Sequence, residues 1–132
     1  MSKLIETIKS LPQLLPLKAA TASEITDAEL QLRLRFSDDY KEYLLEFGAI
    51  MADGIELSGI AKSEHRNVVS LTKRERELNV DVPHSMYAIE ATGVDGIIIW
   101  QDSSGIIYES APNKSPKQIA NSLLEYVEAK MR

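Results

Sequence analysis

The sequence predicts a single α+β domain in which helices pack against an antiparallel β-meander. Segments with helical periodicity fill the N-terminal half, three strand-like segments follow one another between residues 87 and 110, and a helical segment closes the chain. Helices and strands do not alternate one by one, which argues against a parallel βαβ sheet. A chain of 132 residues is long enough for one hydrophobic core and too short for two ordinary domains.

Residues 1–22 are expected to form a short helix and a linker. Apolar residues recur at helical spacing from residue 4 to residue 11, and Pro12 and Pro16 confine the helix to about two turns. Glu6 and Lys9 interrupt the apolar run, so it is a poor secretory signal. No stretch is long and apolar enough for a membrane span, and we expect a cytoplasmic protein.

A second short helix is expected around residue 26. Thr26-x-x-Glu29 matches a capping box, and Ile25, Ala28 and Leu32 line one face of the helix that would follow. Apolar residues also alternate between residues 30 and 34, which leaves a strand over residues 30–35 as an alternative.

The segment 36–60 holds the clearest local signals in the chain. Ser37 is a favoured N-cap, and a carboxylate pair, Asp38 and Asp39, suits the positive end of the helix dipole. One apolar stripe follows at helical spacing and comprises Tyr40, Tyr43, Leu44 and Phe47. Gly48 ends this helix, and the turn at Asp53-Gly54 leads into a strand over residues 55–57.

Another helix is predicted at about residues 68–78, with Asn67 as its cap. The meander then consists of strands over residues 87–91, 96–101 and 106–110. The turn from Asp102 to Gly105 closes the last hairpin; with a bulge at the glycine Trp100 opposes Tyr108, and with a two-residue loop it opposes Ile107.

The run of three isoleucines at residues 97–99 does not alternate with polar residues. Either this strand lies inside the sheet and is covered on both faces, or its second face meets a partner. At the C-terminus, Ser115-Pro116-x-Gln118 combines an N-cap, a proline at the first helical position and a capping-box glutamine. A C-terminal helix is therefore expected over residues 115–132.

Composition and motifs argue against catalysis and nucleic-acid binding. The formal net charge is -5 and basic residues are not clustered, whereas a phosphate-binding surface needs an excess of Lys and Arg. Cysteine is absent, and neither His65 nor His84 has a second ligand at metal spacing. Asp38 and Asp39 are explained by their place in a first helical turn. We expect no enzyme, metal or cofactor.

Three motifs in this order resemble the signature of the SUKH superfamily, which contains bacterial immunity proteins and fungal cell-wall regulators. The motifs are Ile25-x-x-x-Glu29, Phe36-Ser37-Asp38-Asp39-Tyr40-Lys41-x-Tyr43-Leu44-x-x-Phe47-Gly48 and Gly54-Ile55-Glu56-Leu57-x-Gly59-Ile60. Most members carry Leu-Pro-x-Asp-Tyr at the second motif, so Ser37 replaces the usual proline and keeps a helix start. The likeness covers residues 23–111.

The resemblance implies a non-catalytic antitoxin that binds the toxin domain of a polymorphic or contact-dependent secretion system, often a nuclease. Such toxins bind phosphate and tend to be basic, which matches the acidic balance of this chain. A regulatory scaffold without a toxin, as the fungal relatives suggest, is the alternative. We expect the protein to be a monomer or a weak homodimer.

The predicted binding surface consists of acidic residues at turns and strand ends, with one aromatic anchor. Loops that a rigid scaffold holds in place often carry binding residues, and tryptophan is enriched at binding hot spots. The predicted residues are Asp53, Glu56, Asp95, Asp102 and Glu109 as an acidic rim, and Trp100 as the anchor.

Overall fold

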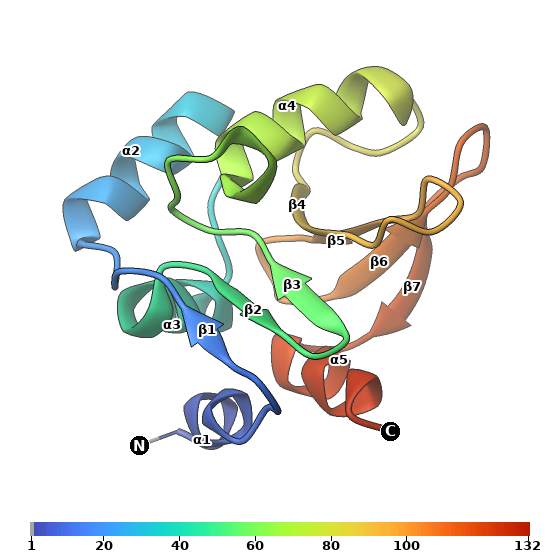
Figure 1. Cartoon of the computed structure of the whole chain (residues 1–132). Coiled ribbons are helices and arrows are strands. Elements are labelled where there is room, and N and C mark those ends of the chain that lie inside the picture. The colour runs from blue at the N-terminus through green and yellow to red at the C-terminus, as the bar shows by residue number, and fades with distance from the viewer. Residues whose placement is uncertain (1) are drawn as a thin grey trace.

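The computed structural model describes residues 2–132 and contains helices and two antiparallel sheets (Figure 1). The helices are α1 (Lys3–Lys9), α2 (Ala22–Leu32), α3 (Asp38–Phe47), the 3-10 turn η1 (Glu64–Arg66), α4 (Val68–Leu78) and α5 (Leu123–Lys130). The strands are β1 (Leu15–Pro16), β2 (Ile50–Ala52), β3 (Ile55–Leu57), β4 (Tyr87–Ala91), β5 (Ile98–Gln101), β6 (Ile107–Ser110) and β7 (Lys117–Ala120). The α+β prediction is confirmed.

The two sheets have the orders β1-β2-β3 and β4-β5-β6-β7, and they meet where β3 lies beside β4. The backbone N–H of Ser58 donates to the carbonyl oxygen of Ile89 at 2.8 Å. The carboxylate of Glu90 accepts from the N–H of Glu56 at 2.7 Å. These two bonds join the small sheet to the meander.

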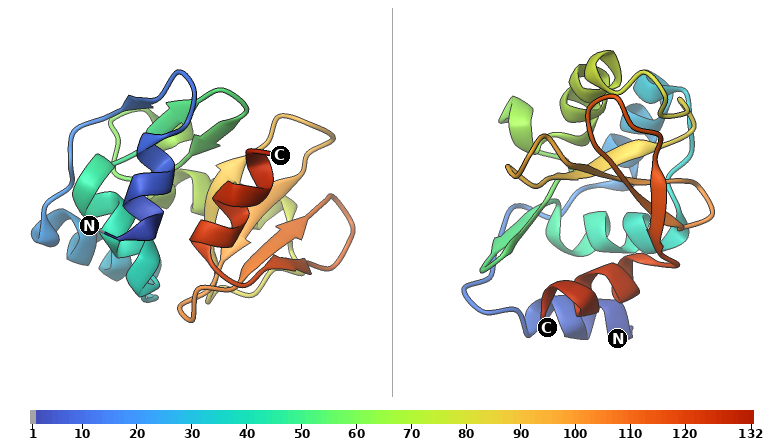
Figure 2. Two further views of the ribbon diagram at one scale, coloured as in Figure 1. Left: turned by 90° about the horizontal axis from the view of Figure 1, so that it is seen from below. Right: turned by 90° about the vertical axis from the view of Figure 1, so that its right-hand side faces the viewer.

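Helices cover both faces of the four-stranded sheet. On one face Leu71 of α4 packs against Ala88, Ile98 and Trp100 of the strands. On the other face the strands share the main core with α3 and α5, and α1 lies against both of these helices (Figure 2). The strand β5 lies between β4 and β6 and is buried along its whole length, which explains the unbroken isoleucine run.

Several local predictions are confirmed. Helix α3 starts after the cap Ser37 and buries its apolar stripe. Helix α4 covers the predicted range, and the side chain of Asn67 caps it. Trp100 pairs with Tyr108, so the hairpin has the register that a bulge at Gly105 predicts.

Helix α2 begins one turn earlier than the capping-box prediction. Thr21 is the N-cap, and it forms a reciprocal capping box with Glu24. Thr26 is an exposed residue within the helix, and the carboxylate of Glu29 accepts from the N–H of Phe36 at 2.8 Å instead. Both Thr-x-x-Glu pairs satisfy the local rule, and the earlier one adds a helical turn. The helix continues to residue 32, so the strand alternative at residues 30–35 is wrong.

The C-terminal prediction is wrong about where the last helix begins. Lys117–Ala120 forms the edge strand β7, which pairs with β6, and α5 starts only after the cap Ser122. The second signal, Ser122-x-x-Glu125, is satisfied because Ser122 accepts from the N–H of Glu125 at 3.1 Å. The backbone hydrogen bonds that residues 117–120 form with the open edge of β6 therefore outweigh the helix-start signal at Ser115.

Two glycines of the family-like motifs lie where three backbone segments come together. A Cβ atom on Gly59 would lie 1.7 Å from the carbonyl oxygen of Gly48, and a Cβ on Gly48 would lie 2.0 Å from that of Lys18. The N–H of Ile60 donates to the oxygen of Gly48 at 2.9 Å, which holds the segments at this spacing. Any side chain at Gly59 must therefore separate β3 from the end of α3.

We expect Gly59→Ala to lower the free energy of unfolding by about 3 kcal/mol or more, because the clash is with backbone rather than with a movable side chain. Gly54→Ala is the matched control: Gly54 has φ +81° but open space around it, so only backbone strain of about 1 kcal/mol is expected. Urea unfolding followed by the fluorescence of Trp100, the sole tryptophan, measures both. Equal losses in the two variants would contradict the close-approach argument.

Candidate functional site

The start of α3 is the most densely hydrogen-bonded part of the family-like motif. One carboxylate oxygen of Asp39 accepts from the hydroxyl of Ser37 and from Nε2 of Gln101 at 3.0 Å. The other oxygen accepts from the backbone N–H of Leu123 at 2.9 Å, at the first turn of α5. Asp39 is thus a structural residue that joins α3 to β5 and α5, which goes beyond the predicted first-turn role.

Two tyrosines of α3 reach from the helix to the small sheet. The hydroxyl of Tyr40 donates to the carbonyl oxygen of Ser58 at 3.0 Å. The hydroxyl of Tyr43 lies 3.0 Å from the carbonyl oxygens of Leu57 and Ser58 and accepts from the N–H of Ile50 at 3.1 Å. Both side chains are fully buried, so they satisfy backbone groups of β2 and β3 that water cannot reach.

A third tyrosine, Tyr87, connects β4 to the cap of α3. Its hydroxyl accepts from the N–H of Ser37 at 2.9 Å and donates to Oε1 of Gln101 at 2.8 Å. Burial is the largest effect on the pKa of Tyr40, Tyr43 and Tyr87, and it raises all three above their ordinary value. These hydroxyls stay neutral and act as hydrogen-bonding groups.

Glu90 is the most buried carboxylate at the junction of the two sheets and is only 3% exposed. It accepts from the hydroxyl of Tyr126, lies 3.6 Å from Nζ of Lys130, and accepts from the N–H of Glu56. Desolvation first, and the charge of Glu90 second, raise the pKa of Tyr126. The carboxylate therefore fastens α5 to both sheets, and its partners explain why an acid is buried there.

Four of the predicted acidic residues lie at one end of the two sheets, and we call them the acidic edge: Asp53, Glu56, Asp95 and Glu109. Asp53 and Asp95 are exposed at the tips of the β2–β3 and β4–β5 connections, which lie on the same side of the molecule in Figure 2. Glu56 and Glu109 are partly buried within strands. The ion pair between Glu56 and Arg66 is 3.6 Å long.

Asp102 does not belong to this edge. It follows β5, at the opposite end of the strand from Asp95. Its carboxylate accepts from the N–H groups of Ser104 and Ile106 and from the hydroxyl of Tyr108, at 3.0 to 3.1 Å. An aspartate commonly organises its own turn in this way, so these bonds explain Asp102 within the fold, and its place in a binding surface stays a prediction.

Trp100 is not a surface anchor. Its side chain has 0% exposure, and its indole N–H donates to the hydroxyl of Ser110 at 2.8 Å. The side chain packs beneath α4 because β5 is covered on both faces, so a partner cannot contact it in this fold. The aromatic-anchor prediction is wrong for this reason.

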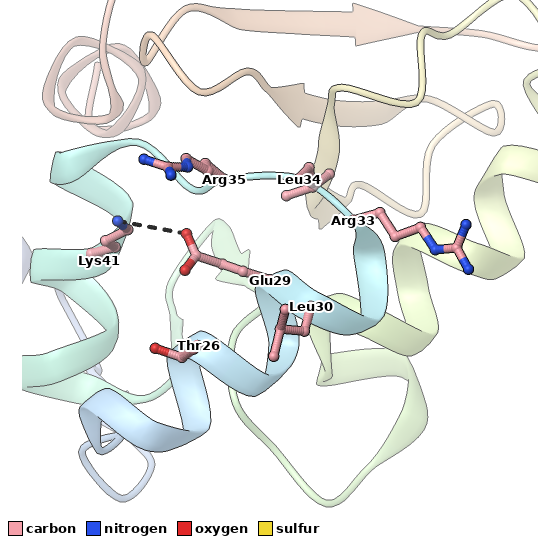
Figure 3. Close-up of a pocket in the computed structure, with 7 residues that line it drawn as sticks. All are labelled: Thr26, Glu29, Leu30, Arg33, Leu34, Arg35 and Lys41. Atoms are coloured by element: carbon pink, nitrogen blue, oxygen red, sulfur yellow. Dashed lines mark ion pairs between the residues drawn. The ribbon is translucent and has the colours of Figure 1, made fainter.

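A hollow of about 540 Å³ lies between α2 and the start of α3, and sequence reasoning missed it (Figure 3). Three cationic residues line it, Arg33, Arg35 and Lys41, together with Glu29, Thr26, Leu30 and Leu34. Lys41 forms an ion pair with Glu29 at 3.5 Å. Arg33 and Arg35 come from the segment that connects α2 to α3, and Lys41 comes from α3. The packing of these two helices, which the sequence pattern does not specify, brings the three cations to one hollow.

The described residues contain no group of three or more His, Asp or Glu side chains placed to hold a metal ion. His65 is exposed and lies 2.9 Å from the hydroxyl of Ser63, and His84 is an exposed loop residue. The buried tyrosines and carboxylates described above are used in structural hydrogen bonds. No described helix is long and apolar enough to cross a membrane.

The buried tyrosines predict a loss of stability in alkaline solution. Folding raises the pKa of Tyr40, Tyr43, Tyr87 and Tyr126 above the ordinary value near 10, so the folded chain keeps protons that the unfolded chain releases. The full contribution is present below about pH 10 and declines above it, by about 1.4 kcal/mol per pH unit for each tyrosine.

Urea unfolding from about pH 8 to about pH 11 measures how the free energy of unfolding changes with pH. Above about pH 10, Tyr43→Phe should make the decline smaller by the contribution of one tyrosine, about 1.4 kcal/mol per pH unit. A free energy of unfolding that stays constant across this range would contradict it.

Comparison with known proteins agrees with this arrangement. The crystal structure of a protein from Pseudomonas syringae pv. tomato superposes with a TM-score of 0.77 at 17% sequence identity, over 97% of this chain and 96% of that chain. At this identity the likeness concerns the fold. A search of the curated proteins found no match.

The family comparison gives a match over the full length. The model of the SMI1-KNR4 cell-wall family, SUKH_5, matches residues 1–132, which include all three motifs and the hydrogen-bonded start of α3. The SUKH resemblance seen in the sequence is thereby confirmed. The chain belongs to the SMI1-KNR4 family of the SUKH superfamily.

Proposed function

We propose that this chain is a non-catalytic immunity protein that binds and neutralises a bacterial toxin domain. The observation that carries the proposal is membership of a superfamily whose members include immunity proteins. The polar residues of the family-like motif serve the fold. The acidic edge supports a basic partner, such as a nuclease, because complementary charge speeds encounter.

The partner is expected to approach the end of the sheets that carries Asp53 and Asp95. Both carboxylates are exposed, neither has a described ion pair, and they lie on loops that antiparallel strands hold in place. Glu56 and Glu109 flank them from within strands, and Glu56 is already paired with Arg66. Asp53 and Asp95 therefore contribute most to attraction at long range.

Co-expression with the protein encoded next to this chain tests the function directly. If the proposal is right, the neighbouring protein stops growth when expressed alone, this chain restores growth, and the two co-purify. A neighbour without toxicity, in an operon of housekeeping genes, would favour the regulatory scaffold that is the alternative function.

Reversal of the exposed acids tests the binding surface. We expect Asp53→Lys with Asp95→Lys to slow association with the toxin at low salt by about tenfold or more, and to change dissociation little. Glu77→Lys with Asp81→Lys is the matched control, because it makes the same charge change at exposed positions near the end of α4. Stopped-flow association at two salt concentrations gives the rates, and an equal effect of both pairs would remove the acidic edge from the interface.

A further inference from the structure

The hollow of Figure 3 is a cationic site on an acidic protein. The whole chain has a formal net charge of -5, yet three cations and one carboxylate give the lining of this hollow a charge of +2. Glu29 is already engaged by Lys41 and by the N–H of Phe36. In the described part of the chain neither Arg33 nor Arg35 has an ion pair or a side-chain hydrogen bond.

The hollow also exposes aliphatic surface. Leu30 is 71% exposed, and the partly buried Leu34 also lines the hollow. Exposed apolar surface that cationic groups surround is suited to an acidic partner surface that carries an aliphatic side chain of its own.

Helix α3, which supplies Lys41 to the cationic hollow, carries a surface of opposite charge on its side toward α1. A second hollow, of about 400 Å³, lies between α1 and α3 and is lined by the acids Asp38, Glu42 and Glu46. Leu45 is 51% exposed among these acids, and Lys41 lines both hollows. Glu46 pairs with Lys9 at 3.8 Å, whereas Asp38 and Glu42 have no described ion pair. The acidic hollow thus mirrors the cationic one in charge and matches it in apolar content.

We propose that this face is a self-association site, in which α3 of one copy seats its acidic side on the cationic hollow of a second copy, and the reverse. A two-fold axis requires a self-complementary patch, and two oppositely charged hollows that share Lys41 provide one. Asp38 and Glu42 of one copy face Arg33 and Arg35 of the other, and Leu45 packs on Leu30. The site uses no residue of the acidic edge.

Sedimentation velocity of the intact chain over about two decades of concentration tests the proposal. We expect the mass to rise from 14.7 kDa toward twice that value. Association should weaken by about tenfold or more between about 0.1 and 1 M NaCl, because salt screens the paired charges. A chain that stays monomeric at every concentration overturns the proposal.

Charge reversal provides the specific test. Arg33→Glu with Arg35→Glu should abolish self-association, and Asp38→Lys with Glu42→Lys should do the same, because each reversal opposes like charges across the axis. An equimolar mixture of the two variants should associate again, since both contacts then pair opposite charges. Lys73→Glu with Lys114→Glu is the control for net charge at exposed positions, and it should associate like the unmodified chain.

None of the reversed side chains has a described hydrogen bond or ion pair within the chain. Asp38→Lys loses the favourable interaction with the positive end of the α3 dipole, about 1 kcal/mol or less, so both reversed variants should still fold, which thermal unfolding checks. Dimers that persist in both reversed variants, or a mixture that stays monomeric, would refute the arrangement. Binding of a labelled acidic peptide rich in Glu and Leu by a strictly monomeric chain, lost in the arginine variant, would assign the hollow to a foreign partner instead.

Discussion

The carboxylate of Asp39 joins three parts of the chain that lie far apart in sequence. Within one side chain, it accepts from the cap of α3, from Gln101 at the end of β5 and from the first turn of α5. Hydrogen bonds to a charged acceptor are stronger than neutral ones, and removing the acceptor would leave partly buried donors unpaired. The helix that carries the family motif is thereby fixed relative to the sheet, and Tyr40 and Tyr43 can then reach β2 and β3.

The polar part of the family motif is therefore explained by the fold. The side chains of Ser37, Tyr40 and Tyr43 satisfy backbone groups in the interior. Gly59 permits the close approach of two backbones. Outside the motif, Glu90 joins the two sheets and α5 through hydrogen bonds. A family can keep such residues for folding alone, while its members bind different partners. Recognition is then expected on exposed residues, which the acidic edge and the two hollows beside α3 supply.

Several local signals were sufficient where a residue acts on its sequence neighbours, although the helix-start signals at Thr26 and Ser115 did not place a helix. The cap at Ser37, the stripe of α3 and the Asp102–Gly105 turn are of this kind, and the structure has each of them. Sequence reasoning failed where long-range pairing decides. The strand β7 forms because β6 offers an edge, and β1 has two exposed residues that include Pro16, so neither carries a strand pattern. Trp100 and the hollow of Figure 3 depend on which elements pack together, which periodicity does not encode.

The separation of structural from exposed charges bears on how this fold can change partners. Asp39 and Glu90 hold the core through charge-assisted hydrogen bonds, so their substitution would alter stability. Asp53, Asp95, Arg33 and Arg35 have no such duty in the described structure, and a change of charge there costs the fold little. Binding specificity can therefore be altered at the loop tips and around α3 while the network that Asp39 anchors stays intact, because the two sets of residues share no contact that the fold requires.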